Sequence, residues 1–372
     1  MGDLLGRLLS RDGWPYALVP FIPIAVALEL AHAGPELIFA TSAVGVIPTA
    51  ALMGRATEEL ADRLGPGIGG LLNVTFGNLP ELLIAFFALL AGLHEVVKAS
   101  IMGSILGNIL LVLGGSMLVG GLGRDHQTFN SRAASAQATM LILASAALIM
   151  PAVFEVVEGD GLPVPGADDR DYSSSVEHLS LAVAIVLLVS YGAGLWFSLK
   201  SHRDLFNPPE EEGWEEDAEP WSTKRSVILL AAAGLAVGLM SEILVGSIEE
   251  TAESVGLSQF FIGIIIVAIV GNAAEHWVAV YVAFKDKMDL AVNIAVGSAA
   301  QVALFVGPLL VVLSFFVGPQ PLALVFNGFE LGAIMLAILI ANTVTSDGES
   351  NWFEGVQLLA VYAIVGIAFY YA

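Results

Sequence analysis

Two acidic motifs lie in the middle of long apolar stretches of this sequence. Gly77-Asn78-Leu79-Pro80-Glu81 falls in the stretch 66–93, and Gly271-Asn272-Ala273-Ala274-Glu275 falls in the stretch 257–284. Neither stretch contains a Lys or Arg that could neutralise its carboxylate. A carboxylate buried at such depth is costly unless it is paired, protonated or bound to a cation. We therefore expect Glu81 and Glu275 to have a functional role.

The residue types in these motifs favour a hard cation. Two carboxylates, the side chains of Asn78 and Asn272 and nearby backbone carbonyls supply only oxygen, which suits Ca²⁺. The chain has no Cys and six His, so Zn²⁺ and Cu⁺ are less favoured. Protons can neutralise the same carboxylates, and Ca²⁺ and H⁺ would then compete for one site. Such competition is sufficient for exchange transport.

A structural alternative exists for the same pattern. Asn-x-x-Glu is typical of a capping box, in which Asn caps a helix and Glu reaches back to the backbone. Gly77, Pro80 and Gly271 would then mark helix breaks in mid-membrane. Because such breaks are tolerated mainly where they line a cavity, this alternative predicts a cavity as well.

Other polar residues are weaker candidates. Ser104 and Ser298 lie on the following apolar stretches at matching places, and either could add an oxygen to the site or serve helix packing. Asn108 and Gln301 lie one turn further on, where a buried amide needs a partner.

A proton path could involve three further groups. Glu58 and Glu242 lie near the ends of apolar stretches, where interfacial solvation is the simpler explanation of their charge. His276 follows Glu275 but points about 100° away from it around a helix, so packing or an ordinary hydrogen bond could also explain it.

Composition indicates which elements must hold these residues. Of 372 residues, 56% are hydrophobic and 13% are charged, and the mean hydropathy is +0.81. This excess of apolar residues predicts an integral protein of the lipid bilayer. The stretches are continuous and lack the alternation of a β-barrel, so we expect an all-α polytopic protein with eleven transmembrane helices. These are 15–32, 35–54, 66–93, 95–121, 133–156, 174–200, 223–247, 257–284, 286–316, 321–346 and 352–371.

The basic residues predict the orientation. With eleven spans, twelve Lys and Arg fall on the side of the N-terminus and two fall on the other side. Positive charge accumulates in cytoplasmic loops, so we expect a cytoplasmic N-terminus and an external C-terminus in a prokaryotic cell membrane. The two external residues are Lys98 and Arg170; the twelve are Arg7, Arg11, Arg55, Arg63, Arg124, Arg132, Lys200, Arg203, Lys224, Arg225, Lys285 and Lys287.

The chain also contains an internal repeat. Three pairs of short segments are each separated by 194 positions. They are the two acidic motifs, Ile68-Gly69 with Ile262-Gly263, and Gly103-Ser104 with Gly297-Ser298. Each half has five spans, so equivalent helices must cross in opposite directions, which is the inverted repeat of many secondary transporters. We predict an extra first span in 1–34, repeats in 35–200 and 223–372, and a linker in 201–222.

The linker is acidic. Seven Asp and Glu residues fall between Pro208-Pro209 and Pro220. They form either a solvated linker or an amphipathic helix that attracts cations to the cytoplasmic face.

Several classes of function are disfavoured. The net charge of −22 argues against a nucleic-acid partner. The sequence has neither a phosphate-binding G-x-x-x-x-G-K-[ST] motif nor an H-E-x-x-H zinc motif. We therefore expect a secondary transporter with no organic cofactor, and neither an ATP-driven pump nor an intramembrane metalloenzyme. A passive channel fits two buried carboxylates less well than alternating access does.

With these motifs the chain resembles the cation/proton exchanger branch of the calcium/cation antiporter superfamily. The resemblance rests on Gly70 to Glu81 and on Gly271 to His276 with Gly297 to Gln301. The sodium/calcium branch would show Gly-Thr-Ser-x-Pro-[Glu/Asp] instead, although Na⁺ or another divalent cation remains an alternative on the same fold. Pro80 departs from the Ala-Val of many relatives.

This resemblance implies more than the residues alone. It implies eleven spans with inverted halves, and Ca²⁺ bound by Glu81 and Glu275 with help from Asn78, Asn272 and backbone oxygens. It also implies outer helices that slide against four inner ones, and assembly into a homotrimer.

Overall fold

The computed structural model describes residues 14–165, 171–201 and 221–372, without the side chains of 65–68, 70 and 74. Nearly all of these residues are helical, as expected for apolar segments that must satisfy their own backbone hydrogen bonds in lipid. Two short strands, β1 (Gln127–Thr128) and β2 (Glu349–Ser350), pair antiparallel with Gln127 opposite Ser350. The helices are η1 (Trp14–Leu18), α2 (Phe21–Leu30), α3 (Pro35–Gly77), α4 (Leu79–Leu90), α5 (His94–Leu106), η2 (Gly107–Val112), α6 (Leu113–Gly121), α7 (Ser131–Glu158), α8 (Ser174–Trp196), η3 (Phe197–Ser201), α10 (Thr223–Gly246), α11 (Ile248–Val255), α12 (Gln259–Phe261), η4 (Ile262–Val267), α13 (Ala268–Phe284), α14 (Met288–Gln301), η5 (Val302–Val306), α15 (Gly307–Ser314), α16 (Gly328–Val344) and α17 (Trp352–Tyr371).

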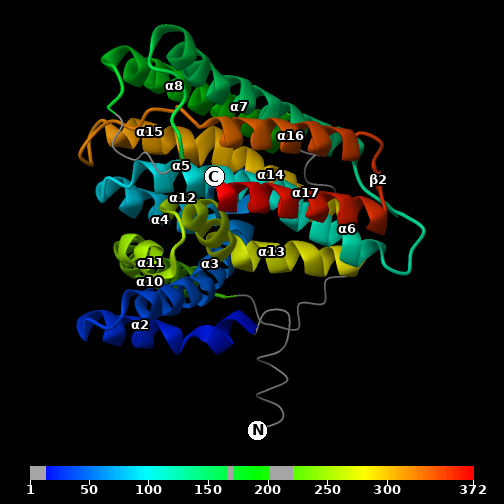
Figure 1. Ribbon diagram of the computed structural model, residues 1–372. Helices are drawn as coiled ribbons and strands as arrows, with labels where there is room; N and C mark the ends of the chain where they lie inside the picture. The colour runs from blue at the N-terminus through cyan, green and yellow to red at the C-terminus, as the bar shows by residue number, and fades with distance from the viewer. Residues whose placement is uncertain (1–13, 166–170, 202–220) are drawn as a thin grey trace.

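The described residues form a membrane-spanning helical bundle (Figure 1). Eight helical segments are long and apolar enough to cross a bilayer, and a bent pair, Leu71–Gly77 with Leu79–Leu90, makes a ninth. Two shorter apolar segments, Trp14–Leu30 and Gly328–Val344, lie among them. The polytopic helical fold is thus confirmed, and the count of eleven spans stays a prediction.

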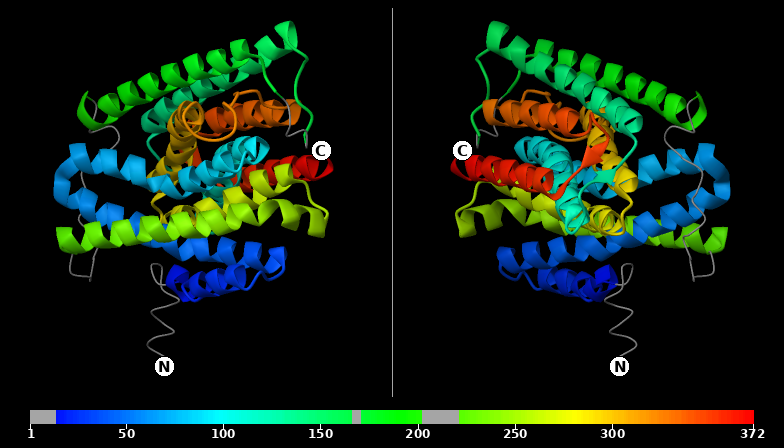
Figure 2. Two further views of the ribbon diagram at one scale, coloured as in Figure 1. Left: turned by 90° about the vertical axis from the view of Figure 1, so that its left-hand side faces the viewer. Right: turned by 90° about the vertical axis from the view of Figure 1, so that its right-hand side faces the viewer.

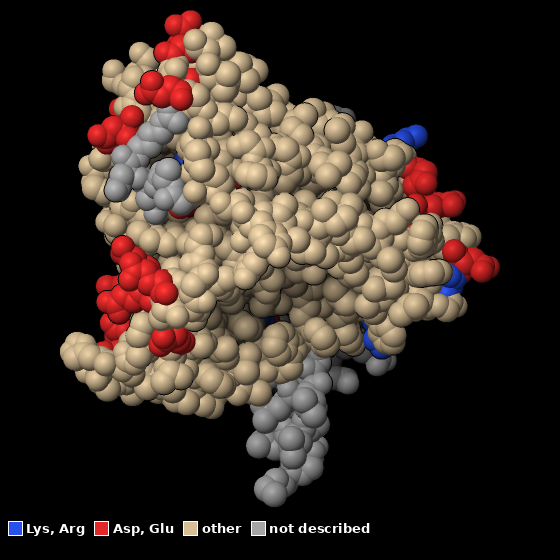
Figure 3. Space-filling model, viewed as in Figure 1, with Lys and Arg blue, Asp and Glu red and all other residues tan. Residues whose placement is uncertain are grey.

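On the face drawn in Figure 3, the exposed charged side chains gather at the two ends of the bundle. Figure 3 shows a broad belt without charge between acidic clusters at one end and mixed acidic and basic side chains at the other. At the mixed end, Arg124 forms an ion pair with Asp286 at 3.4 Å, and Asp289 accepts a hydrogen bond from the backbone N–H of Asn130. The uncharged belt is the surface expected to face lipid.

Helix α3 contains a reversal of the chain. Its 43 residues would measure about 65 Å if straight, roughly twice the hydrocarbon thickness of a bilayer. However, a Cβ atom on Gly69 would lie 2.2 Å from the carbonyl oxygen of Ala61, whereas residues eight apart in a straight helix are separated by about 12 Å. The chain therefore turns back between these two residues (Figure 2). The first crossing extends to Leu64, ten residues beyond the predicted end of the second span.

The first acidic motif lies at a helix break and the second does not. α3 ends at Gly77 and α4 begins at Leu79 with Pro80 in its first turn, and the two segments meet at 46°. By contrast, α13 runs without interruption through Gly271. The predicted break at Gly271 is therefore wrong: a single Gly without a following Pro is tolerated inside a helix, and the irregular turn lies earlier, in the π-helical η4.

The two central crossings have the same internal construction. One crossing consists of α5, η2 and α6, and the other consists of α14, η5 and α15; their first residues are 194 positions apart. Each crossing contains a π-helical segment, and the last residues of these segments, Val112 and Val306, are also 194 positions apart. Most side chains of α5 and α14 are buried. This correspondence supports the repeat that the motifs predict, and both crossings form the core that positions the site.

The predicted tenth span begins later than expected. Residues 321–327 have no helical structure, and α16 starts at Gly328. The side chains from Leu322 to Phe326 are nevertheless buried. Two of their backbone N–H groups donate to side chains from other elements, that of Leu324 to Oγ of Ser180 and that of Leu322 to Oγ of Ser314. Apolar composition alone does not distinguish such a buried extended segment from a helix.

Some predictions lie outside the described residues. These are most of the acidic linker (202–220), the N-terminal residues 1–13 and the external Arg170.

Candidate functional site

The two predicted glutamates face the opposite half of the chain. Glu81 is 4% exposed in the first turn of α4, and Glu275 is partly buried on α13. The two carboxyl groups are close enough for their charges to interact. A Cβ on Gly271 would lie 3.6 Å from Cγ of Glu81, and a Cβ on Gly77 would lie 3.8 Å from Oε1 of Glu275. Each motif glycine therefore lies next to the glutamate of the other motif, at ordinary contact distance.

Hydrogen bonds link the Asn of each motif to the Ser of the other half. Asn272 donates from Nδ2 to Oγ of Ser104 at 3.1 Å, and Ser298 Oγ lies 3.4 Å from Oδ1 of Asn78. These four residues are all buried. Asn78 with Asn272, and Ser104 with Ser298, are repeat equivalents, so both contacts join equivalent residues. The direction differs, because Asn272 donates to Ser104 whereas Asn78 accepts from Ser298. The structure thus brings the main candidates and both serines into one cluster.

The surroundings of Glu275 are richer in hydrogen bonds than those of Glu81. Ser298 Oγ lies 3.1 Å from Oε2 of Glu275, and Asn108 donates from Nδ2 to Ser298 Oγ at 3.2 Å. Asn78 also donates from Nδ2 to Oε1 of Gln301. A serine has a single O–H donor, so Ser298 can serve either Glu275 or Asn78 at one time. Asn108 and Gln301 therefore belong to the cluster, as predicted for site lining.

Three buried oxygen atoms in this cluster have no hydrogen-bond donor among the described residues. They are Oε2 of Glu81, Oδ1 of Asn108 and Oδ1 of Asn272. Leaving a buried acceptor unsatisfied is costly. A cation in contact with such oxygens, or a proton on the carboxylate, would remove this cost.

The capping-box alternative can be decided by comparing four Asn-x-x-Glu sequences. Asn327 with Glu330 and Asn351 with Glu354 both form complete capping boxes at the starts of α16 and α17. Asn78 caps no helix with its side chain, and Asn272 lies inside α13. The alternative is therefore wrong for the two motifs, whose Asn side chains bond across to the other half instead.

The predicted proton-path residues are placed differently from one another. Glu58 is exposed on α3, and its charge interacts with that of Glu275. Glu242 is exposed on α10. Nε2 of His276 is buried and has no hydrogen-bond partner among the described residues. Whether these three groups carry protons stays a prediction.

Sequence reasoning did not single out Gln137. Its Nε2 atom would lie 3.2 Å from a Cβ on Gly297, next to Ser298, and its Oε1 atom is buried without a donor among the described residues. The signal was available, since Gln137 is an amide in the apolar stretch 133–156, comparable to Asn108.

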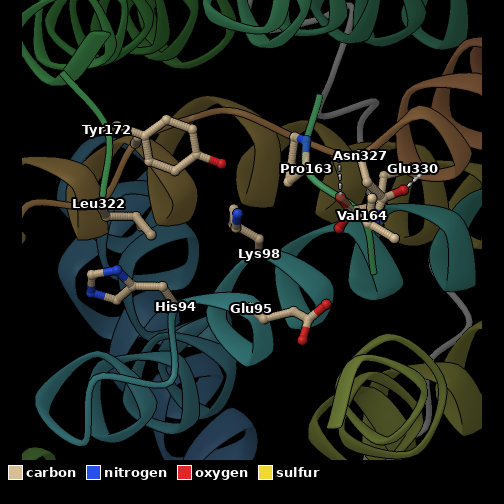
Figure 4. Close-up of a pocket in the computed structure, with 10 residues that line it drawn as sticks. His94, Glu95, Lys98, Pro163, Val164, Tyr172, Leu322, Asn327 and Glu330 are labelled. Carbon is tan, nitrogen blue, oxygen red and sulfur yellow. Dashed lines mark hydrogen bonds between the residues drawn. The ribbon is translucent and has the colours of Figure 1, made fainter. Parts of the chain in front are cut away.

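A second polar cluster lies at the other end of α5 (Figure 4). Lys98 donates from Nζ to the carbonyl oxygen of Val325 at 3.1 Å and lies 5.9 Å from the ring centroid of Tyr172. Buried Glu330 belongs to the α16 capping box and interacts electrostatically with Lys98. Lys98 thus joins α5 to the extended segment 321–327. The residues lining this pocket are His94, Glu95, Lys98, Pro163, Val164, Tyr172, Leu322, Ala323, Asn327 and Glu330.

Comparison with characterised sequences gives close relatives. The family model described as "Sodium/calcium exchanger protein" matches residues 36–200 and 225–371. A "Ca(2+)/H(+) antiporter" of Aphanothece halophytica is 43% identical over 380 residues, covering 98% of both chains. The "Ca(2+)/H(+) antiporter ChaA" of Bacillus subtilis is 46% identical over 351 residues, covering 94% of this chain and 96% of that protein.

Solved structures give the same relationship. The structure of native YfkE matches with a TM-score of 0.81 at 42% identity, covering 96% of this chain and all of that one. A structure described as the H⁺/Ca²⁺ exchanger CAX matches with a TM-score of 0.71 at 16% identity, covering 98% of this chain and 93% of that one, and shows the likeness of the fold. From the family match and the identities together, the chain belongs to the sodium/calcium exchanger protein family.

Proposed function

We propose that this chain is a Ca²⁺/H⁺ antiporter that exports cytoplasmic Ca²⁺ in exchange for protons. The observation that carries the proposal is the buried cluster around Glu81 and Glu275, whose two carboxyl groups lie within electrostatic reach of each other. Three of its buried oxygens have no donor among the described residues. The names of the relatives from Aphanothece halophytica and Bacillus subtilis support the choice of Ca²⁺ and H⁺.

The donor set of the cluster fits Ca²⁺ as the substrate. Ca²⁺ takes about six to eight oxygen ligands in flexible geometry. Two carboxylates, the unpartnered amide oxygens of Asn108 and Asn272 and the hydroxyl of Ser298 provide enough candidates. The described residues contain no group of three or more His, Asp and Glu side chains suited to a metal ion, and the proposed site therefore combines two carboxylates with amide and hydroxyl oxygens.

Charge compensation explains how the two substrates are coupled. A pair of ionised glutamates buried in the membrane is unfavourable, and either Ca²⁺ or two protons would neutralise the pair. The neutral, loaded states can pass through the conformational change, and the doubly charged empty state is disfavoured. Ca²⁺ and H⁺ therefore cross in turn, in opposite directions, through alternating access.

We further propose that eleven spans form two inverted halves, 35–200 and 223–372, with the additional first span at the N-terminus. The reciprocal Asn–Ser bonds and the matching π-helical interruptions support a pseudo-twofold relation between the halves. The distribution of basic residues supports a cytoplasmic N-terminus and an external C-terminus in a prokaryotic cell membrane. Sliding outer helices and assembly into a trimer remain expectations from the family resemblance.

Exchange of Na⁺ for Ca²⁺ on the same fold is the second candidate. It is favoured only by the description of the matching family, which mentions sodium. The motifs carry Asn rather than the Thr-Ser pair of the sodium/calcium branch. Calcium flux that follows an imposed Na⁺ gradient in strongly buffered vesicles, with no pH gradient, would favour this candidate over proton exchange.

Everted membrane vesicles that contain the protein provide the test. With an imposed pH gradient, acidic inside, added Ca²⁺ should dissipate the gradient and accumulate in the vesicles. Glu81→Gln and Glu275→Gln should each reduce both signals by at least about 100-fold, since each removes a charge that the bound cation must neutralise. Glu249→Gln, at an exposed position of α11, is the matched control and should exchange normally. Normal exchange in both site variants would contradict the proposed site.

A further inference from the structure

A shallow groove with basic side chains lies at the N-terminus of α10, far along the chain from the glutamate motifs. It is lined by Ser222, Lys224, Arg225, Ile228 and Leu229. None of these five residues is acidic, and Ser222, Lys224 and Arg225 are exposed. The groove therefore combines two positive charges and a hydroxyl with two apolar side chains.

The depth of the groove in the membrane follows from the helix that carries it. α10 is one of the eight helices able to cross the bilayer, so its first turn lies at headgroup level whichever side faces the cytoplasm. Ile228 follows Lys224 by one turn and is 56% exposed, and Leu235 further along is 78% exposed. This face passes from cationic to apolar in the direction in which a phospholipid passes from phosphate to acyl chain.

The base of the groove is fixed by an aromatic contact between two helices. Two guanidinium groups lie close to the ring of Trp221, with Cζ of Arg225 4.5 Å and Cζ of Arg55 5.0 Å from its centroid. The N–H of Trp221 donates to Oε2 of Glu59 on α3 at 2.8 Å. Arg225 is thus held in place by its contact with the Trp221 ring, while Lys224 has no ion-pair partner among the described residues.

We propose that this groove binds the phosphate headgroup of an anionic phospholipid. Basic pockets at the ends of transmembrane helices attract anionic headgroups, and each Lys or Arg near the membrane surface adds a similar amount of binding free energy. Lys224 contacts the phosphate, and Ile228 and Leu229 contact the start of the acyl chain. The backbone N–H of Arg225 is already bonded to Oγ of the capping Ser222. Because Arg225 also stacks on Trp221, the bound lipid rests against the junction between α3 and α10.

Lipid retention by the purified full-length protein tests this proposal. The protein in detergent is mixed with dioleoyl phosphatidylglycerol or with dioleoyl phosphatidylcholine, and bound lipid is counted by native mass spectrometry over a range of lipid concentrations. Phosphatidylglycerol should bind more tightly than phosphatidylcholine, and less tightly in high salt. Lys224→Gln should weaken phosphatidylglycerol binding about fivefold. Lys224→Arg should retain it, and Lys285→Gln, at another exposed cation, should leave it unchanged.

Three outcomes would overturn the proposal. Equal retention of both lipids would mean that the groove binds acyl chains without regard to headgroup charge. An equal loss in Lys224→Gln and Lys285→Gln would indicate unspecific attraction to the protein's positive charge. The third concerns the acidic residues Glu215, Glu216, Asp217 and Glu219, which precede the groove in sequence. If phosphatidylglycerol binds only after these four are changed to Gln, the groove is occupied by the chain's own acidic segment.

Discussion

The two glutamates of the site differ in how they are held. Glu275 receives a hydrogen bond from Ser298, whose hydroxyl is in turn bonded by Asn108, whereas Oε2 of Glu81 has no donor among the described residues. The repeat does not predict this difference, because the positions equivalent to Asn108 and Gln301 are occupied by Val302 and Gly107. Two related motifs have thus produced a site with one constrained carboxyl group and one less constrained.

Removing the two equivalent serines should therefore have unequal effects. Ser298→Ala removes a hydroxyl that contacts Glu275, Asn78 and Asn108. One of these contacts is to a carboxylate, and such a hydrogen bond is worth more than one to a neutral amide. We expect its apparent Ca²⁺ affinity to fall about tenfold. Ser104→Ala deletes only the bond to Asn272 and should lower the affinity about threefold. Concentration dependence of ⁴⁵Ca²⁺ uptake into vesicles measures both, and equal losses would contradict the inequivalence of the two glutamates.

Competition between Ca²⁺ and H⁺ predicts the direction in which the apparent Ca²⁺ affinity changes with pH. Protons and Ca²⁺ neutralise the same pair of carboxylates, so lowering the pH on the side from which Ca²⁺ binds should weaken apparent Ca²⁺ affinity. In the range where the pair takes up two protons, the apparent dissociation constant should change by up to about 100-fold per pH unit. Isothermal titration of the purified protein with Ca²⁺ at several pH values measures this slope. An affinity independent of pH would show that protons bind elsewhere.

At the level of helices, close packing depends on small residues that let backbones approach. A Cβ on Gly355 of α17 would lie 2.3 Å from the backbone nitrogen of Leu118 and 2.6 Å from the carbonyl oxygen of Gly114 on α6. Neither backbone atom can move as the end of a flexible side chain would. The contact between α6 and α17 therefore requires glycine at this position.

Substitution of this glycine should loosen the bundle without touching the site. Gly355→Ala forces α17 away from α6, and we expect a loss of about 1–3 kcal/mol in stability, seen as a lower midpoint of thermal unfolding. The matched control is Gly234→Ala in α10, where an added Cβ meets no atom within 4 Å. That variant should be neutral or slightly stabilised, since alanine is the better helix former. Similar midpoints for both variants would disprove the close approach.

Periodic and compositional signals predicted these helices well, but not their irregularities. Apolar length located the eight helical segments that are long enough to cross a bilayer, and the Pro80 motif located the break after Gly77. The extended segment 321–327 was missed because apolar residues that are fully buried need not be helical. Backbone N–H groups of this segment find hydrogen-bond acceptors in Ser180 and Ser314, which lie outside the segment in the sequence. The cluster of the site was predictable from the repeat, whereas the bonds from Asn78 to Gln301 and from Asn108 to Ser298 depend on tertiary packing.

At the scale of the whole molecule, the charge distribution makes a definite prediction of orientation. Alkaline phosphatase, which is active only outside the cytoplasm, should be active when fused after Ala372. The same enzyme fused after Ser201, at the end of the predicted sixth span, should be inactive. Activity of the second fusion with inactivity of the first would reverse the proposed orientation. Activity or inactivity of both would contradict the odd number of spans between them.

The reciprocal Asn–Ser bonds have a consequence for biosynthesis. Ser104 bonds to Asn272, and Asn78 contacts Ser298. These partners are about 170 to 220 positions further along the chain, so they are not yet synthesised when the first half leaves the ribosome. Until they are synthesised, the nascent chain holds one lone carboxyl group and no complete set of ligands. Under the proposed mechanism, a truncated or half-inserted polypeptide therefore lacks the second carboxylate and half of the ligands for calcium.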